Sequence, residues 1–297
     1  MKYFHGTTDF FAEGPTAVTL GKFDGVHLGH QKLMRHIKEL EKEGVSSVCF
    51  ALNGNEGSFL MTHNEQRRLV EELGISCLIS CPFVPEIFTM SPEQFVEEIL
   101  VKRLHARYIA VGTDFCFGYR RSGNAAYLKS LEQRYGFRVD ILEKERLGKR
   151  EISSTYVREA LEQGNMELVT RLLGRPFLVE GTVLHGRKLG RTLGFPTINL
   201  IPSAQKLLPP NGVYATRTSI AGKIYPGITN IGCKPTVSGN FRGVETYLFD
   251  LDMDLYGAQV WTQIHTFERR EQKFSSVEEL KAQVQKDIAF GREYFFE

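Results

Sequence analysis

The chain has 297 residues, of which 42% are hydrophobic and 24% are charged, and its formal net charge is +2. This balance is typical of a soluble globular protein and, as bulk charge, favours neither nucleic-acid binding nor a membrane surface. The length is sufficient for one large domain or two ordinary domains.

The five cysteines form no CxxC pair, and four of them lie in apolar, strand-like segments. Such cysteines behave as small hydrophobic residues in a reducing compartment. The N-terminal stretch "MKYFHGTTDFFAEGP" lacks the apolar core of a signal peptide, and no apolar run is long enough to cross a bilayer. We therefore expect a cytoplasmic protein that binds neither a membrane nor a nucleic acid. The sequence is compatible both with a monomer and with a homo-oligomer.

In the first half of the chain, short apolar runs alternate with helical patterns. Strands are expected at residues 16–21, 45–52, 77–83, 107–112 and 137–142. Helices are expected after the glycine-rich turn up to Gly44, and over residues 64–74 and 91–104. This alternation predicts an α/β domain with a parallel sheet, whose ligands bind beyond the carboxyl ends of the strands.

From about Phe177 the pattern changes to strands separated by Gly, Pro and Asn turns. The strand-like segments are residues 177–184, 212–220, 223–232, 244–252 and 259–267. A closing helix follows the capping pattern of Ser275 and Ser276, and one of its faces carries Val277, Leu280, Val284 and Ile288. An all-β unit of this size predicts a small barrel. We place two domains at residues 1–176 and 177–297.

The segment "TLGKFDGVHLGHQKLM" joins the first of these strands to a helix through a glycine-rich turn. Backbone N–H groups at such a helix start bind anions, and His27 and His30 would face the same open end. Two histidines at this spacing could also bind a metal ion, or serve as core residues. The turn is neither a P-loop nor a dinucleotide fingerprint. It resembles the HxGH signature of nucleotidylyltransferases, in which histidines stabilise phosphate charge.

A nucleotide triphosphate needs a second clamp, and "EISSTYVREALEQG" offers one. Ser153, Ser154 and Thr155 precede a helix whose free N–H groups can bind an anion, and Arg158 could reach a phosphate from the first turn. Taken alone, this segment is an ordinary helix cap. Together with the histidine turn, it resembles the "ISSTxxR" element of the same superfamily.

Longer blocks narrow the resemblance to the prokaryotic bifunctional riboflavin kinase/FMN adenylyltransferase (FAD synthetase) family. They include "VGTDFCFGYRRSGN", "LLGRPF", "GRTLGFPTINL", "NIGCKPT", "VETYLFD" and "RREQKFSSVEELKAQVQKD". The resemblance implies a Rossmann-like nucleotidylyltransferase domain followed by a six-stranded antiparallel β-barrel riboflavin kinase domain with a C-terminal helix. It implies phosphorylation of riboflavin to FMN and adenylylation of FMN to FAD, with Mg²⁺ as cofactor and ATP as co-substrate.

The resemblance also assigns residues in the adenylyltransferase half. His27 and His30 would be catalytic. ATP would be bound by Gly21, Phe23, Asp24, Gly25, His27, Gly29, His30, Ser153, Ser154, Thr155 and Arg158. FMN would be bound by Asp114, Phe117 and Asn124.

In the kinase half, Thr197 and Asn199 alternate on a strand-like segment, so both side chains point the same way. Their oxygens are hard ligands that suit Mg²⁺, and the resemblance makes them the metal and ATP contacts of a "PTxN" motif. It adds Gly186, Gly190, Gly194 and Pro196 around the ATP phosphates, although a flexible basic hairpin would also fit this loop. Spacing alone makes Glu245 an exposed strand residue; the resemblance makes it the catalytic base, with Arg270 and Phe274 at the flavin.

Two blocks depart from the family pattern. A proline–histidine stretch after the second expected strand is replaced by a segment with Asn53, Gly54 and Asn55, and Cys116 stands where the family has arginine. Both departures fall in the adenylyltransferase half. Three hypotheses follow: a two-activity enzyme, a kinase with weakened adenylylation, and a flavin-binding RNA regulator without chemistry.

Overall fold

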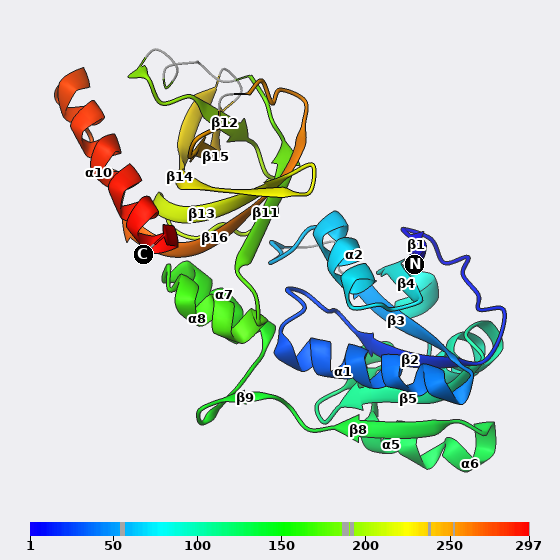
Figure 1. Ribbon diagram of the computed structural model, residues 1–297. Coiled ribbons are helices and arrows are strands. Elements are labelled where there is room, and N and C mark those ends of the chain that lie inside the picture. Colours follow the sequence, from blue (N-terminus) through cyan, green and yellow to red (C-terminus); the bar gives the residue numbers. More distant parts are fainter. Residues whose placement is uncertain (54–56, 186–189, 191–192, 237–238, 252, 297) are drawn as a thin grey trace. The chain divides into compact units, whose positions relative to one another are not determined.

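The computed structural model describes residues 1–53, 57–185, 190, 193–236, 239–251 and 253–296 (Figure 1). The chain forms two compact units, one of Met1–Gly57 with His63–Ser153, and one of Ser58–Thr62 with Ser154–Glu297. We call them the first unit and the second unit. In the described part of the chain, no helix combines the length and the apolar character needed to cross a membrane.

The first unit is built on a parallel sheet in the order β1-β4-β3-β2-β5-β8. Its strands are β1 (Lys2–His5), β2 (Thr16–Gly21), β3 (Ser46–Asn53), β4 (Cys77–Pro82), β5 (Ala106–Gly112) and β8 (Arg138–Leu142). From β2 the chain builds the sheet first toward β4 and later toward β8, so the strand order reverses between β2 and β5. Ligands of open α/β sheets bind at this kind of switch point.

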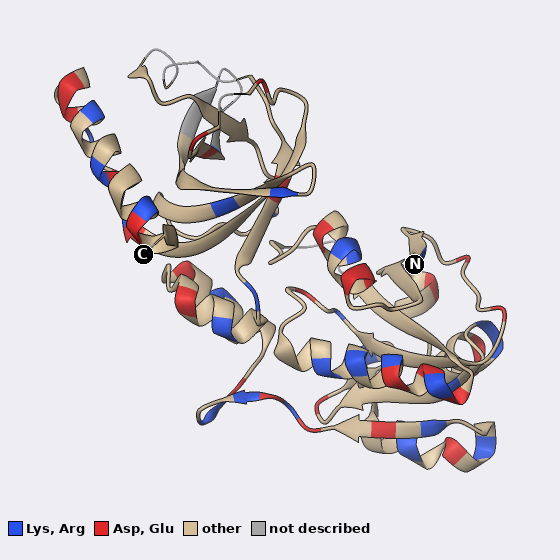
Figure 2. Cartoon of the chain, viewed as in Figure 1, with Lys and Arg blue, Asp and Glu red and all other residues tan. Residues whose placement is uncertain are grey.

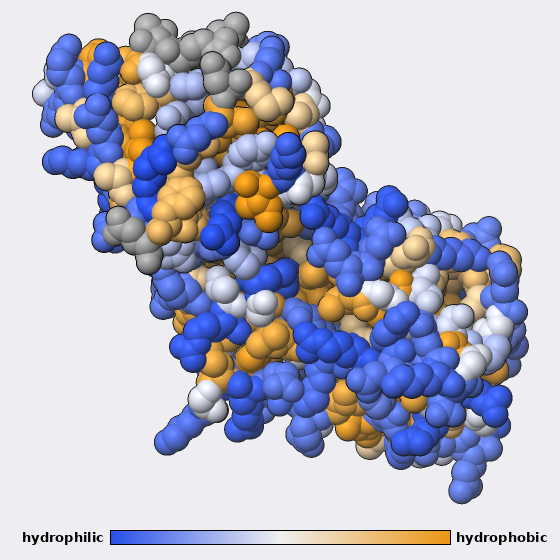
Figure 3. All heavy atoms as spheres, viewed as in Figure 1, coloured by the Kyte–Doolittle hydropathy of each residue, from blue (hydrophilic) through white to orange (hydrophobic). Residues whose placement is uncertain are grey.

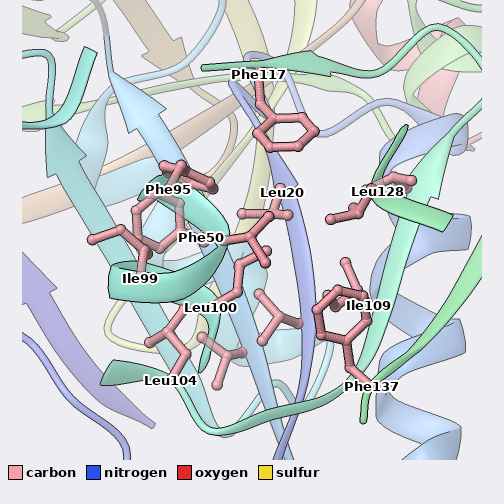
Figure 4. Packing of buried hydrophobic residues seen from close by; sticks show 14 of the residues in the cluster. Leu20, Phe50, Phe95, Ile99, Leu100, Leu104, Ile109, Phe117, Leu128 and Phe137 are labelled. Atoms are coloured by element: carbon pink, nitrogen blue, oxygen red, sulfur yellow. The ribbon is translucent and has the colours of Figure 1, made fainter. Parts of the chain in front are cut away.

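Helices cover both faces of this sheet. They are α1 (Leu28–Glu39), η1 (Leu40–Glu43), α2 (His63–Glu72), α3 (Pro85–Phe88), α4 (Pro92–Phe95), the π-helical η2 (Val96–Arg103), η3 (Tyr119–Arg121), α5 (Ala125–Ser130) and α6 (Glu132–Tyr135). On one face, α4, η2 and α5 bury a core against alternate strand residues such as Leu20, Phe50 and Ile109 (Figure 4). α1 packs on β2, β3 and β5 with a separate buried stripe.

Two short ribbons complete this unit: β6 (Cys116–Phe117) pairs with β7 (Gly123–Asn124), and β9 (Arg146–Leu147) pairs with β10 (Arg150–Glu151). The second ribbon carries much of the basic cluster between residues 144 and 150, where blue and red segments alternate in Figure 2. Arg146 and Lys144 bond Glu151 at 2.9 and 3.1 Å. The basic charge of this ribbon is therefore partly paired within the unit.

The second unit contains the expected antiparallel sheet in the order β11-β16-β13-β14-β15-β12. Its strands are β11 (Phe177–Thr182), β12 (Thr197–Leu200), β13 (Gly212–Ile220), β14 (Lys223–Thr236), β15 (Gly239–Leu248) and β16 (Gln259–Arg269). Beyond β11, the Leu184 amide donates to the carbonyl of Asn199 in β12 at 2.9 Å. This bridge brings the two edges together, and the sheet curls into a half-barrel. The predicted fold class is confirmed.

Threonines fill part of the barrel interior instead of aliphatic residues. Thr229 lies between Thr216 and Thr246, with hydroxyl oxygens 2.8 Å apart on each side, and Thr218 lies 3.1 Å from Thr262. All five side chains are fully buried. Because each hydroxyl finds a partner, the polar interior does not carry the cost of unsatisfied buried groups.

Among the described residues of the second unit, the helices whose bounds are defined are α7 (Ser154–Glu162), α8 (Met166–Leu173) and α10 (Val277–Phe296). α10 lies along β13 and β14 (Figure 1). It starts as the capping pattern predicts, since Ser276 Oγ accepts from the Glu279 amide at 3.1 Å. Of the expected apolar face, Leu280 and Val284 turn toward the barrel, whereas Val277 is 50% exposed because it lies at the free first turn.

The segment Ser58–Thr62 is incorporated into the second unit by backbone hydrogen bonds. The Phe59 amide donates to the Gln205 carbonyl, and the Leu207 amide donates to the Phe59 carbonyl, each at 2.8 Å. Thr62 Oγ1 donates to Glu180 of β11 at 2.7 Å. This contact between distant parts of the sequence could not be expected from local patterns.

Candidate functional site

The glycine–histidine turn lies at the switch point of the parallel sheet, directly after β2. Phe23, Gly25 and Val26 have positive φ values of 50°, 80° and 40°, so the turn is tight and departs from ordinary backbone conformations. Two buried glutamine side chains hold it: Gln31 Nε2 donates to the Val26 carbonyl at 2.9 Å, and Gln66 Nε2 donates to the Phe23 carbonyl at 3.3 Å. The turn is therefore a built feature that fixes where α1 begins.

His27 is the N-cap residue of α1, and its Nδ1 accepts from the His30 amide at 3.4 Å. The two imidazole rings stack with centroids 3.6 Å apart, and Phe23 lies edge-on to His30 at 5.1 Å. Burial, and then the neighbouring His27, lower the pKa of His30 well below its usual value. His30 is therefore neutral near pH 7 and keeps one N–H donor. Its Nδ1 is buried and has no hydrogen-bond partner within the described residues.

Gly29 allows this stacking. A Cβ atom there would lie 3.2 Å from the His27 ring and 3.9 Å from the carbonyl of Ile152. Ile152 is buried and immediately precedes Ser153, so the chain that leads to α7 passes the histidine turn within the first unit. Gly21 is similarly close to Phe23, since a Cβ atom at Gly21 would lie 3.1 Å from the phenyl ring.

The predicted FMN residues have three different surroundings. Asp114 follows the carboxyl end of β5, and its 70% exposed carboxylate pairs with Lys144 at 2.8 Å. Phe117 is buried and stacks on Phe115 at 5.5 Å. Asn124 is exposed and caps α5 by accepting from the Tyr127 amide at 2.8 Å. Of the three, Asp114 presents a carboxylate at the ligand-binding edge of the sheet.

The serine-rich element divides between the units: Ser153 ends the first, and Ser154, Thr155 and Arg158 belong to α7 of the second. Arg158 Nη2 donates to the carbonyl of Ser58 at 2.8 Å, and its guanidinium therefore already has one backbone partner. The prediction that these residues and the histidine turn hold one triphosphate stays a prediction. Gly54 and Asn55 of the departing segment lie outside the described residues.

The second unit contains a cavity of about 250 Å³ between the barrel and α10, which we call the barrel cavity. Its wall combines polar residues from the strands with apolar residues from α10. The lining residues are Gly190, Leu193, Phe195, Thr197, Val213, Ile228, Asn230, Glu245, Tyr247, Arg269, Glu271, Gln272, Phe274, Leu280, Val284 and Asp287. An apolar wall with a few converging polar groups is the usual form of a small-molecule site.

Glu245 of β15 and Thr197 of β12 meet at the wall of this cavity. Thr197 Oγ1 donates to Glu245 Oε1 at 2.6 Å. In the antiparallel register Asn199 lies opposite Glu245, so Thr197 and Asn199 lie on the same face of the sheet as Glu245. Two residues 48 positions apart are thus placed side by side by strand pairing.

The glycine-rich loop is described only in part. Gly186 lies outside the described residues. Gly190 accepts from the Phe195 amide at 2.8 Å, and a Cβ atom at Gly190 would lie 2.5 Å from the Phe195 carbonyl oxygen. Gly194 has a φ of +88°, which favours glycine. Pro196 lines a second hollow of about 40 Å³ on the other side of Thr197, together with Tyr256 and Asp254.

Of the two residues predicted at the flavin, Phe274 lines the barrel cavity and Arg270 is exposed, whereas Arg269 from the same block also lines the cavity. Sequence reasoning missed Arg269, Asp287 and Asn230 as cavity residues. A signal for Arg269 was present in the "RREQKF" block, where either arginine could face inward. Asp287 had no local signal, because an acidic residue in an amphipathic helix is usually solvated.

Oxygen donors that could fit a metal ion lie together on β12. Within the described residues, no group of three or more His, Cys, Asp or Glu side chains is arranged to hold a metal ion. Thr197 and Asn199 offer a hydroxyl and an amide oxygen on one strand, and the Glu245 carboxylate is hydrogen-bonded to the first of them. Few protein ligands, all of them oxygen, fit the preference of Mg²⁺ for keeping waters and substrate phosphates.

Comparison with family models divides the chain in the same order as the two sites. Residues 11–156 match the model described as FAD synthetase, and residues 173–295 match the model described as riboflavin kinase. The chain is 35% identical over 290 residues to the bifunctional riboflavin kinase/FMN adenylyltransferase of Haemophilus influenzae, with 94% of each chain covered. The protein of that name from Escherichia coli K12 is 36% identical over 289 residues, covering 94% of this chain and 92% of the other.

A solved structure has the same fold over nearly the whole chain. It is described as a macrolide-efflux protein from Streptococcus pneumoniae and is 28% identical, with a TM-score of 0.87 and 99% of each chain covered.

Proposed function

Because the chain belongs to the family of bifunctional riboflavin kinases/FMN adenylyltransferases, we propose that the barrel cavity phosphorylates riboflavin and that the glycine–histidine turn adenylylates FMN. The chain is a transferase of flavin cofactor biosynthesis, with ATP, riboflavin, FMN and FAD as its substrates or products. Which residues act, and how, belongs to the proposal. So do the catalytic domain limits of 1–176 and 177–297, although the compact units divide at Ser153.

The observation that carries the kinase assignment is the Thr197–Glu245 pair at the cavity wall. A carboxylate at the wall of a cavity of this size can accept the proton of a substrate hydroxyl as that oxygen attacks the terminal phosphorus of ATP. Glu245 accepts a 2.6 Å hydrogen bond from Thr197, which fixes the orientation of its carboxyl group. The products of this step are FMN and ADP, and the proton stays on Glu245 until solvent removes it.

The proposed metal ligands are Thr197 and Asn199. Mg²⁺ held there would supply positive charge to the phosphates during transfer. The contribution of the chain is to present two oxygen ligands beside the base, on strands whose pairing sets their spacing. Gly190 and Gly194 would let the backbone approach the phosphates, because glycine has no side chain in the way. At Gly190 a side chain would also meet the Phe195 carbonyl.

For the second reaction, His27 and His30 stand at the start of α1, where the helix N–H groups already favour anions. Imidazole N–H donors can stabilise the charge on the α-phosphate of ATP while a phosphate oxygen of FMN attacks it, releasing pyrophosphate. A neutral His30 suits this position because it donates without the desolvation cost of a buried ammonium.

Both departures from the family pattern concern this adenylyltransferase site. Cys116 is half-buried in β6, two residues after the exposed Asp114. A thiol there supplies no phosphate contact of the kind an arginine would make. We therefore expect adenylylation to run, and to be the slower of the two activities. The working place of the enzyme is proposed to be the cytoplasm, consistent with five free cysteines.

A single assay tests the assignment. Purified protein is incubated with riboflavin, ATP and Mg²⁺, and the flavins are separated by chromatography over time. We expect FMN to appear first and FAD to follow. FMN without FAD would leave only the kinase, and absence of any turnover by folded protein would favour the non-catalytic flavin-binding alternative.

A further inference from the structure

A buried ion pair holds α10 to the barrel. Asp287 of α10 is 2% exposed, and Arg269 at the end of β16 donates to it from Nε at 2.8 Å and from Nη2 at 2.6 Å. Gln283, one turn earlier in α10, donates to the same carboxylate at 2.7 Å. Arg269 and Asp287 both line the barrel cavity, so this pair fixes part of the cavity wall as well as the helix.

A second carboxyl group lies at the same place. Glu268 is within hydrogen-bonding reach of the Asp287 carboxyl. It lies at a β-bulge, since Arg269 pairs with Val213 of β13 whereas Glu268 has no partner in that register. Glu268 Oε2 is buried and has no hydrogen-bond partner within the described residues.

If both carboxyl groups were ionised, the charge of the single guanidinium would leave one buried negative charge uncompensated. Three of the five Arg269 N–H groups are in use, because Nε and Nη2 bond Asp287 and Nη1 donates to the Arg270 carbonyl at 3.1 Å. Within the part of the chain that the structure describes, no donor bonds Glu268 Oε2, so an ionised Glu268 would repel the Asp287 carboxylate. A protonated Glu268 can donate to Asp287, and the three groups are then neutral together.

The surroundings favour the protonated form near neutral pH. Burial, and then the charge of Asp287, raise the pKa of Glu268 to about 7, with Arg269 opposing them. The charged groups that act on Glu268 are Arg269 of its own strand and Asp287 of α10, to which the uncharged Gln283 donates. Val213 of β13 carries no charge, and α8, which also packs on β16, places its Glu167 carboxylate against Thr266.

We propose that Glu268 is a positioning residue whose proton completes the Arg269–Asp287 pair, so that losing this proton loosens the α10 wall of the barrel cavity and weakens riboflavin binding. The inference rests on the proposed assignment of this cavity to riboflavin. Loss of the Glu268 proton makes the kinase site bind riboflavin more weakly as pH rises above neutrality.

The test is the affinity for riboflavin, measured without ATP by the quenching of flavin fluorescence between about pH 6 and about pH 8.5. One pKa unit of coupling corresponds to about a tenfold change in affinity, so we expect a loss of about three- to tenfold in the natural protein. Glu268→Gln keeps an uncharged donor beside Asp287, and its affinity should change by less than about twofold over the same range.

Glu293→Gln, on an exposed position of α10, is the matched control and should keep the natural pH profile. A flat profile in the natural protein, or the natural slope in Glu268→Gln, would overturn the inference while leaving the assignment of the cavity intact. Absence of riboflavin binding at every pH by folded protein would overturn both.

Thermal unfolding supplies a readout that needs no flavin. A carboxyl whose pKa is raised by folding binds more protons in the folded state, so the stability of the natural protein falls as pH rises from about 4.5 to about 7. Glu268→Gln should lack this component and gain stability relative to the natural protein across that window. No relative gain would count against the buried proton.

Discussion

Glu245, the proposed base, is half-buried and differs in its surroundings from a solvated strand carboxylate. It lines the barrel cavity, and Thr197 Oγ1 donates to it at 2.6 Å. His30 in the first unit is a comparable case, because burial and its stacked neighbour His27 keep it neutral. In both places the proposed chemistry depends on one side chain that a neighbour orients.

Glu245→Gln should lower FMN formation by roughly 100-fold or more, because an amide cannot accept the substrate proton. Conversion of supplied FMN to FAD should be unchanged, since the histidine turn lies in the other unit. Both rates are measured by chromatography of the flavins.

The reciprocal control is His30→Ala. It should leave riboflavin phosphorylation intact and lower FAD formation by roughly 100-fold, the usual effect of removing a donor to a developing negative charge. A folded variant of either kind that lost both activities would contradict two separate sites.

At the scale of elements, the position of the start of β12 depends on Gly190 in the preceding loop. A Cβ atom at Gly190 would lie 2.5 Å from the backbone oxygen of Phe195 and 3.3 Å from Thr197 Oγ1. Gly190→Ala should therefore displace β12 and lower kcat/KM of the kinase by about tenfold or more, because small misplacements of reacting groups are costly. Riboflavin and ATP titrations of the initial rate measure the effect.

Gly14→Ala is a matched control, since no atom lies within 4 Å of the Cβ position there and Gly14 lies in the first unit. It should leave both kinetic constants close to their natural values. A Gly190→Ala enzyme with unchanged kinetics would show that the loop tolerates a shifted Phe195.

Local signals located most elements well. The strand at Thr16–Gly21 and the ends of the helices at Gly44 and Ser276 follow from apolar periodicity, a left-handed glycine and a serine cap. The same signals missed β1 (Lys2–His5), which exists because it pairs in parallel with β4. A four-residue edge strand is decided by its partner and not by its own sequence.

At the scale of the molecule, each unit has its own core and should unfold in its own transition. Riboflavin at about 100 times its Kd should raise the free energy of unfolding of the second unit by about 2.7 kcal/mol. The unfolding temperature of the first unit should not change. Differential scanning calorimetry with and without riboflavin measures both.

A substitution in the first unit provides the opposite perturbation. Burial alone would raise the pKa of Glu41, but hydrogen bonds from Lys38, Ser47 and Ser76 lower it to about 2. Glu41→Gln should therefore lower the unfolding temperature of the first unit by roughly 3–8 °C near pH 7. The difference should disappear as pH falls from about 4.5 through about 2, where the natural carboxylate is protonated. A single transition that responds to both changes would contradict independent units.

The surface of the face seen in Figure 3 is mainly hydrophilic, with hydrophobic residues in small scattered groups. A mainly hydrophilic surface agrees with the ordinary proportions of hydrophobic and charged residues in the chain. Composition thus indicates the class of protein, whereas the motifs indicate its function.

The sequence by itself predicted most of the elements in their order, the two architectures, the histidine turn and the candidate residues of the kinase motif. These depend on local periodicity, turn residues and short motifs, which are properties of neighbouring residues. Only the tertiary structure decided that Thr197 bonds Glu245, that Arg269 lines the cavity, and that Glu268 meets Asp287. Strand register, a β-bulge and helix docking fix these contacts, and each joins residues too far apart in the chain for any local pattern to specify.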